Sequence, residues 1–161
     1  MTEASLAERL GRILNGRGWT VATAESCTGV LIAGAITEIA GSSAWFDRGF
    51  VTYSNEAKVE MLGVRSTTLD AHGAVSEATA REMVAGALTR SGATFAVAVT
   101  GIAGPAGGTP AKPVGLVWLA WGRRDGPVDT QSEHFEGDRA AVRTATVQRA
   151  LEGLIERASG G

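Results

Sequence analysis

Three short polar segments hold the side chains best suited to chemistry, and each follows a run of residues typical of a β-strand. They are residues 24–29, 52–58 and 100–105. In an open α/β sheet, ligands bind beyond the carboxyl ends of the strands, where turns lead into helix N-termini that favour anions. The three segments therefore indicate one site, built at the carboxyl ends of three strands.

Ser26 is the candidate nucleophile of the first segment. It lies between a β-branched run at 20–24 and an apolar helical stretch at 31–39, a position from which a hydroxyl faces the crevice. Serine is also one of the commonest helix N-caps, and the sequence leaves that alternative open. Cys27 is a rival nucleophile, but as the neighbouring residue we expect it to point elsewhere.

A serine nucleophile needs a base. The two histidines, His72 and His134, do not follow a strand directly, so a histidine-based triad is not expected. Lys58 can serve as the base if its surroundings lower its pKa, and Tyr53 can relay the proton or orient the pair. The alternative for Lys58 is an ordinary solvated lysine on a helix surface.

The segment GIAGPAGGTPAKP at 101–113 holds four glycines and three prolines and predicts an irregular loop. Its glycines let the backbone approach a ligand, although a flexible lid is the alternative. Thr100, just before it, offers a hydroxyl to substrate or to an oxyanion. Arg139 and Arg143 lie at i and i+4 of a terminal helix, where they can clamp a phosphate or remain solvated.

Composition excludes several classes of function. The 15 basic and 17 acidic residues give a net charge of −2, so no basic surplus exists to bind nucleic acid. The single cysteine excludes an internal disulfide and a cysteine-rich zinc motif, which favours a cytoplasmic location. No signal-peptide pattern and no long apolar run is present, so we expect no membrane association.

The elements that must position these residues follow from hydrophobic periodicity. It predicts helices at residues 4–15, 31–39 and 140–155, a short one capped by Asn55 and another preceded by Ser76, with strands at 20–24, 45–53, 95–99, 114–121 and 131–135. This order predicts one α/β domain over residues 1–161, a three-layer α/β/α sandwich with a mostly parallel mixed sheet. The short connection between the last two strands predicts an antiparallel pair.

Five motifs in these segments are similar to those of one family. They are TAESCTG at 23–29, GSSAWFDRGFVTYSNEAK at 41–58, HGAVSE at 72–77, TGIAGPAGGTPAKPVG at 100–115 and FEGDRAAVR at 135–143. In order and spacing they resemble the CinA C-terminal-domain family, in its stand-alone form, over nearly the whole chain. The resemblance implies an amidohydrolase without metal or cofactor. It would convert nicotinamide mononucleotide to nicotinate mononucleotide and ammonia in pyridine-nucleotide (NAD) salvage.

The resemblance also assigns residues. It makes Ser26 the nucleophile and Lys58 and Tyr53 its activating partners. Expected to bind substrate are Thr28, Gly29, Thr100, Gly101, Gly104, Arg139 and Arg143. Where the family commonly has a second glycine after the threonine of the first motif, this chain has Val30, which would either crowd the ligand or pack against the sheet.

Two alternatives to this function stay open on the sequence. One is a regulatory module that binds pyridine nucleotides without catalysis, and the other is an amidase of a different small amide. The resemblance further implies a homodimer, for which the four tryptophans and the pair Trp45 and Phe46 offer an apolar interface.

Overall fold

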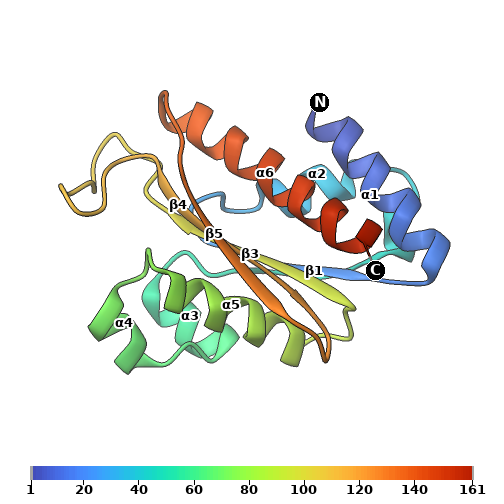
Figure 1. Ribbon diagram of the computed structural model, residues 1–161, viewed down its shortest axis with the longest axis horizontal. Coiled ribbons are helices and arrows are strands. Elements are labelled where there is room, and N and C mark those ends of the chain that lie inside the picture. Colours follow the sequence, from blue (N-terminus) through green and yellow to red (C-terminus); the bar gives the residue numbers. More distant parts are fainter. Residues whose placement is uncertain (1, 161) are drawn as a thin grey trace.

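A five-stranded sheet lies between two layers of helices in the computed structural model, which describes residues 2–160 (Figure 1). The elements are α1 (Glu3–Arg17), β1 (Val21–Glu25), α2 (Leu31–Thr37), a 3₁₀ turn (Ser42–Ala44), β2 (Phe46–Val51), α3 (Asn55–Leu62), α4 (Ser66–His72), α5 (Glu77–Thr89), β3 (Phe95–Gly101), β4 (Leu116–Arg123), β5 (Val128–His134) and α6 (Arg139–Gly160). The prediction of a three-layer α/β/α domain is confirmed.

The strand order is β2-β1-β3-β4-β5. β1 pairs in parallel with both β2 and β3, whereas β4 pairs antiparallel with β3 and with β5. Four strands therefore run in one direction and β4 alone runs against them, which confirms the mostly parallel sheet and its antiparallel β4–β5 pair. Because β1 lies between β2 and β3, the chain goes from β1 to the strand on one side of it, β2, and then to the strand on its other side, β3. Such a switch point opens a crevice at the carboxyl ends of the strands.

Helices α1, α2 and α6 cover one face of the sheet (Figure 1). On α1 the side chains of Leu6, Leu10 and Leu14 recur every four residues and are buried in the core between these helices and the sheet. Thr2 caps the start of α1, and Gly18 ends it in the left-handed conformation with φ 69°.

Helices α3, α4 and α5 cover the opposite face (Figure 1). α5 packs its apolar side directly on the alanine-rich inner strands, in a second buried cluster. At Gly86 of α5 a Cβ atom would collide with the carbonyl of Leu62, so the end of α3 rests on the backbone of α5. This close approach fixes the position of α3, the helix that carries Lys58.

Some boundaries differ from the prediction. Helix α4 was not predicted, because its seven residues STTLDAH show no repeating apolar stripe. Ser54, not Asn55, caps α3, since the Ser54 hydroxyl accepts the N–H of Ala57. β3 continues to residue 101, β4 begins at 116 rather than 114, β5 spans 128–134, and α6 runs to residue 160.

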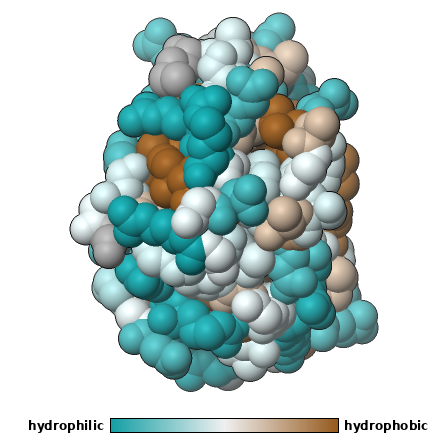
Figure 2. Space-filling view, turned by 90° about the vertical axis from the view of Figure 1, so that its right-hand side faces the viewer, coloured by the Kyte–Doolittle hydropathy of each residue, from teal (hydrophilic) through white to brown (hydrophobic). Residues whose placement is uncertain are grey.

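Two of the four tryptophans expected at an apolar interface are buried. Trp45 is only 3% exposed and packs in the core against α1, where it would touch a Cβ placed on Gly11, and Trp121 is fully buried. Figure 2 shows the end of the molecule away from the loop 101–115, where hydrophilic residues surround small, separate apolar areas. Within residues 2–160, no helix is both long enough and apolar enough to cross a membrane.

Candidate active site

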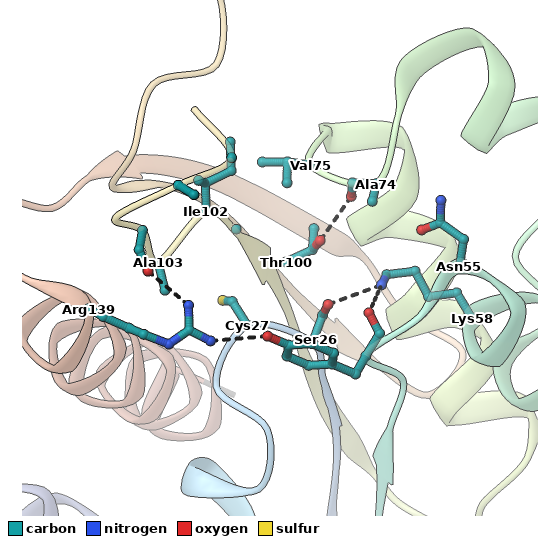
Figure 3. Close-up of a pocket in the computed structure, with 15 residues that line it drawn as sticks. Ser26, Cys27, Asn55, Lys58, Ala74, Val75, Thr100, Ile102, Ala103 and Arg139 are labelled. Carbon is teal, nitrogen blue, oxygen red and sulfur yellow. Dashed lines mark hydrogen bonds between the residues drawn. The ribbon is translucent and has the colours of Figure 1, made fainter. Parts of the chain in front are cut away.

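Ser26 is the first residue after β1 and is 8% exposed (Figure 3). Its N–H donates to the carbonyl of Val99 on β3, and its carbonyl accepts the N–H of Gly29. Helix α2 begins only at Leu31, so Ser26 does not cap it and the N-cap alternative is wrong. The backbone around the serine is held by the neighbouring strand, while the hydroxyl faces α3.

Lys58 is buried, with 1% of its surface exposed, and its ammonium nitrogen points at Ser26 (Figure 3). Nζ lies 3.0 Å from Ser26 Oγ, 2.9 Å from the Thr52 carbonyl and 3.4 Å from the Tyr53 carbonyl. Burial lowers the pKa of Lys58 because the charged amine loses its hydration. The alternative of a solvated lysine is therefore wrong.

An ammonium group donates to all three oxygens, those of Ser26, Thr52 and Tyr53, and the same contacts are also compatible with a neutral amine. The two carbonyl oxygens can only accept, so each takes one N–H of Lys58. An uncharged Nζ then has its lone pair left for the third partner, the hydroxyl of Ser26. This arrangement allows the serine to donate its proton to Lys58.

Glu25, directly before Ser26, has a role that the sequence analysis missed. Its buried carboxylate accepts the Thr28 hydroxyl at 2.5 Å and the N–H groups of Ile32 and Ala33 at 2.8 and 3.0 Å. Burial raises the pKa of Glu25 and these hydrogen bonds oppose that rise. Since Val30 makes no side-chain cap, Glu25 caps α2 from the end of β1 and holds the turn that presents Ser26.

A cavity of about 270 Å³ opens above Ser26. Of the expected site residues, the structure brings together Ser26, Tyr53, Lys58, Thr100, Gly101, Gly104 and Arg139; the remaining lining comes from Cys27, Asn55, Ala74, Val75, Ile102, Ala103, Ala106 and Gly107. Three expected binding residues, Thr28, Gly29 and Arg143, lie outside this lining. Thr28 is fully buried and is bound to Glu25.

The roof of the cavity is the loop that follows β3. Gly101 allows the loop to leave the sheet tightly, because a Cβ there would lie 2.6 Å from Val117 Cγ2. Gly104 has φ 84° and packs against Val114. Lys112 donates to the carbonyl of His72, which ties the loop to α4.

Thr100 directs its hydroxyl proton at another residue of the cavity lining. The hydroxyl donates to the carbonyl of Ala74 at 2.9 Å (Figure 3). In this arrangement Thr100 offers the cavity an acceptor oxygen, and its contact with Ala74 joins β3 to the segment between α4 and α5.

The two arginines of α6 have separate partners. Arg139 donates to the Gly104 carbonyl at 2.9 Å and to the Tyr53 hydroxyl at 3.0 Å (Figure 3). Arg143 donates to the carbonyls of Cys27 and Thr28, at 3.2 and 3.1 Å, and so braces the turn after Ser26. The two arginines are therefore not arranged as one clamp, and Arg139 remains exposed while Arg143 is half-buried.

Arg139 also lies between two cavities. Together with Ala103 it lines both the cavity at Ser26 and a second one of about 660 Å³ at the start of α6, which includes Arg143 and Asp138. The Asp138 carboxylate caps α6 by accepting the N–H of Ala141, as its position before the helix predicts.

The rival nucleophile Cys27 lines the cavity but is unreactive, and the two histidines lie outside the cavity. Burial raises the pKa of the Cys27 thiol to about 12, which keeps it protonated and unreactive at neutral pH. His72 ends α4 and His134 ends β5, and neither lines the cavity. Among residues 2–160 no three histidine, cysteine or acidic side chains are grouped as metal ligands.

Val30 lies outside the cavity lining and does not pack on the sheet. Its side chain is 57% exposed, its φ is −120°, and it is absent from the cavity lining. The alternative in which Val30 packs against the sheet is therefore wrong, and crowding of the ligand stays a prediction.

Asn55 is the polar residue of the lining that the sequence analysis treated only as a helix cap. It precedes Lys58 by three residues on α3, and this spacing places both side chains on one side of the helix. That spacing was the signal by which the sequence could have placed Asn55 in the site.

Comparison with known proteins identifies the family of the chain. The family model described as the CinA C-terminal domain matches residues 3–158. The nicotinamide-nucleotide amidohydrolase PncC of Escherichia coli strain K12 is 56% identical over 152 residues, which cover 94% of this chain and 92% of that protein. The protein of the same name from Enterobacter agglomerans is 59% identical over 155 residues, 94% of each chain.

Solved structures give the same result. The competence/damage inducible protein CihA from Agrobacterium tumefaciens has a TM-score of 0.94 and 57% identity, covering 96% of this chain and 94% of its own. A CinA superfamily protein from Klebsiella pneumoniae has a TM-score of 0.95 and 44% identity, and covers 100% of both chains.

Proposed function

Since this chain belongs to the CinA C-terminal domain family, we propose that it is an amidohydrolase that converts nicotinamide mononucleotide to nicotinate mononucleotide and ammonia in NAD salvage. The curated relatives that carry the name nicotinamide-nucleotide amidohydrolase match nearly all of the chain. The observation that supports a serine mechanism is the contact between Ser26 Oγ and the buried amine of Lys58.

The proposed reaction begins when neutral Lys58 takes the hydroxyl proton of Ser26. Ser26 Oγ then forms a bond to the carboxamide carbon, and the π electrons of the C=O bond move to its oxygen. When this intermediate collapses, the C–N bond breaks, its electron pair stays on nitrogen, and the Lys58 ammonium supplies the proton with which ammonia leaves. Water, deprotonated by Lys58, attacks the acyl-serine; the ester bond to Ser26 Oγ breaks, Oγ takes the proton back from Lys58, and the carboxylate product leaves.

The oxyanion of this intermediate needs hydrogen-bond donors. Backbone N–H groups of the loop after β3 are the proposed source, because that loop lines the cavity. Thr100 is less suited, since its hydroxyl proton is directed at Ala74. Thr100 instead suits a substrate hydroxyl or N–H group.

Arg139 is the proposed ligand of the substrate phosphate. Its guanidinium lies between the two cavities at the start of α6, where a helix N-terminus also favours an anion. Tyr53 is proposed to act with Arg139, since its hydroxyl contacts Arg139 while only its carbonyl reaches Lys58. Arg143 supports the turn at Cys27 and Thr28 and does not need to touch the substrate.

The function is tested by incubating the protein, dialysed against a chelator, with nicotinamide mononucleotide and measuring ammonia and nicotinate mononucleotide. Ser26→Ala should abolish release, and Ser132→Ala, on exposed β5, should not. Arg139→Ala should remove the preference for the mononucleotide over nicotinamide riboside. Tight nucleotide binding without release would favour the regulatory binding module, and release only from another amide would favour the amidase of different substrate.

We also propose a homodimer in the cytoplasm. The exposed large apolar residues, which the structure places on α2, on α3 and at the open edge of the sheet, support an interface there: Val30, Leu31, Val51, Val59 and Met61, with Tyr53 beside them. Light scattering should give twice the mass of the chain, and Val51→Lys should give the single mass. A monomer at micromolar concentration would exclude the dimer.

A further inference from the structure

Asn55 is the polar side chain of the cavity that has no assigned partner. Ser26, Lys58, Thr100, Tyr53 and Arg139 each hold a side-chain hydrogen bond to a described residue. Among residues 2–160, the Asn55 carboxamide makes none, although it lines the cavity. Both its acceptor and its donors are therefore available to a bound molecule.

The position of Asn55 relative to Lys58 indicates which part of a substrate it meets. The two residues lie at i and i+3 of α3, and Figure 3 shows both on the right-hand side of the view, Asn55 beside Ala74 and Lys58 below it. Under the proposed function, the nitrogen of the attacked carboxamide departs toward Lys58, which gives it a proton. The nitrogen side of the substrate amide then faces α3, and with it Asn55.

An uncharged carboxamide nitrogen carries two N–H donors and needs an acceptor. The carbonyls of Thr52 and Tyr53, which are close to Lys58, already accept from that lysine. Asn55 Oδ1 is an acceptor on the same helix that remains free.

We propose that Asn55 is a substrate-binding residue that accepts an N–H of the scissile carboxamide and turns its nitrogen toward Lys58, so that it favours amides over esters. The proposal rests on the proposed amidohydrolase function. Without Asn55 the amide can rotate about its bond to the ring, and fewer bound molecules have the nitrogen within reach of Lys58.

The test compares two substrates of one shape, nicotinamide mononucleotide and the methyl ester of nicotinate mononucleotide. Hydrolysis of the ester releases methanol, and the ester group has no N–H that Asn55 could accept. Asn55→Ala should lower kcat/KM for the amide by about 10- to 30-fold, as expected for one lost hydrogen bond, and change that for the ester by less than about 3-fold. Retained ester hydrolysis also shows that the variant is folded.

Equal losses for both substrates would overturn the proposal, because Asn55 would then bind the ribose or the phosphate. No loss for either would overturn it as well. If the unaltered protein hydrolyses neither substrate, the proposed function fails instead, and that result is distinct. Asn15→Ala, at the far end of α1, is the matched control and should leave both rates unchanged.

Asn55→Asp provides a second, independent readout. Aspartate keeps an acceptor oxygen, so amide turnover should recover toward that of the unaltered protein at alkaline pH. The added carboxylate beside Lys58 favours its charged form, so the rise of kcat/KM with pH should move to higher pH. A rise that stays in place would contradict the proximity of the two side chains to one bound substrate.

Discussion

Replacing Lys58 by methionine removes the buried amine and keeps an unbranched side chain of similar length. In the structure Nζ contacts Ser26 Oγ at 3.0 Å and two main-chain carbonyls, those of Thr52 and Tyr53. The substitution therefore deletes the base, and later the acid, of the proposed reaction without emptying the space that the lysine fills.

The expected loss in kcat/KM is about 10⁴-fold, or roughly 5.5 kcal/mol in activation free energy. Because the serine and the lysine act as a unit, Ser26→Ala should cost a similar factor, and the double variant should be no slower than either single one. Two carbonyls lose a donor, which costs about 1 kcal/mol each, while the penalty of burying an amine disappears. The free energy of unfolding should change by less than about 2 kcal/mol.

The pH dependence has a definite sign. The neutral form of Lys58 is the active one, so kcat/KM should rise with pH, and because burial lowers its pKa the rise should end below the range of an exposed lysine. In the unfolded chain Lys58 binds its proton more tightly than in the folded one. The free energy of unfolding should therefore increase between the folded and unfolded pKa values, by at most about 1.4 kcal/mol per pH unit, and Lys58→Met should remove that increase.

The assays are ammonia release from nicotinamide mononucleotide across pH and urea unfolding at each pH. Lys112→Met, which removes the other lysine of the chain, is the matched control and should retain most activity. A folded Lys58→Met protein with more than a tenth of the original kcat/KM would refute the role of Lys58 as base. A double variant far slower than both single variants would refute the claim that Ser26 and Lys58 act together as one catalytic unit.

Three further outcomes follow from the same geometry. Glu25→Ala should lower the free energy of unfolding by about 2 to 4 kcal/mol in urea titrations, because the N–H groups of Ile32 and Ala33 lose their cap, and an unchanged midpoint would contradict that role. Iodoacetamide at pH 8 should leave Cys27 unlabelled and the activity intact until the chain is unfolded, because burial raises the pKa of the Cys27 thiol to about 12. Rapid labelling of the native protein, detected by mass spectrometry, would contradict this expectation. Val30→Gly should change kcat/KM by less than about 2-fold, because the side chain is exposed and outside the cavity, and a large gain in rate would show that it obstructs the substrate.

Local pattern was sufficient for most of the fold. The leucines of α1 and the apolar run of β3 each identify their own element, because burial on one side or on both sides repeats with the geometry of a helix or strand. Helix α4 was not predicted because its seven mostly polar residues show no such repeat. It is held by tertiary contacts, such as the Thr68 hydroxyl that donates to Glu82 of α5.

For the site, the sequence was sufficient to identify where polar residues end a strand, but not what each would contact. Arg139 and Arg143 show the difference. Spacing places them on one face of α6, yet one reaches the Tyr53 hydroxyl and the other reaches the carbonyls of Cys27 and Thr28. The two arginines are one helical turn apart on α6. Their different partners are decided by the segments from elsewhere in the chain that pack against each turn.

The sequence by itself determined that three strand ends bearing Ser26, Tyr53 and Thr100 share one edge of a sheet, because the rules of parallel sheets follow from the order of elements. Only the tertiary structure decided that Lys58 is buried and meets Ser26, 32 positions away. It also decided that Glu25 caps α2. The physical reason is that desolvation and hydrogen-bond partners depend on which distant segments pack around a group, whereas helices and strands are encoded by their neighbours in sequence.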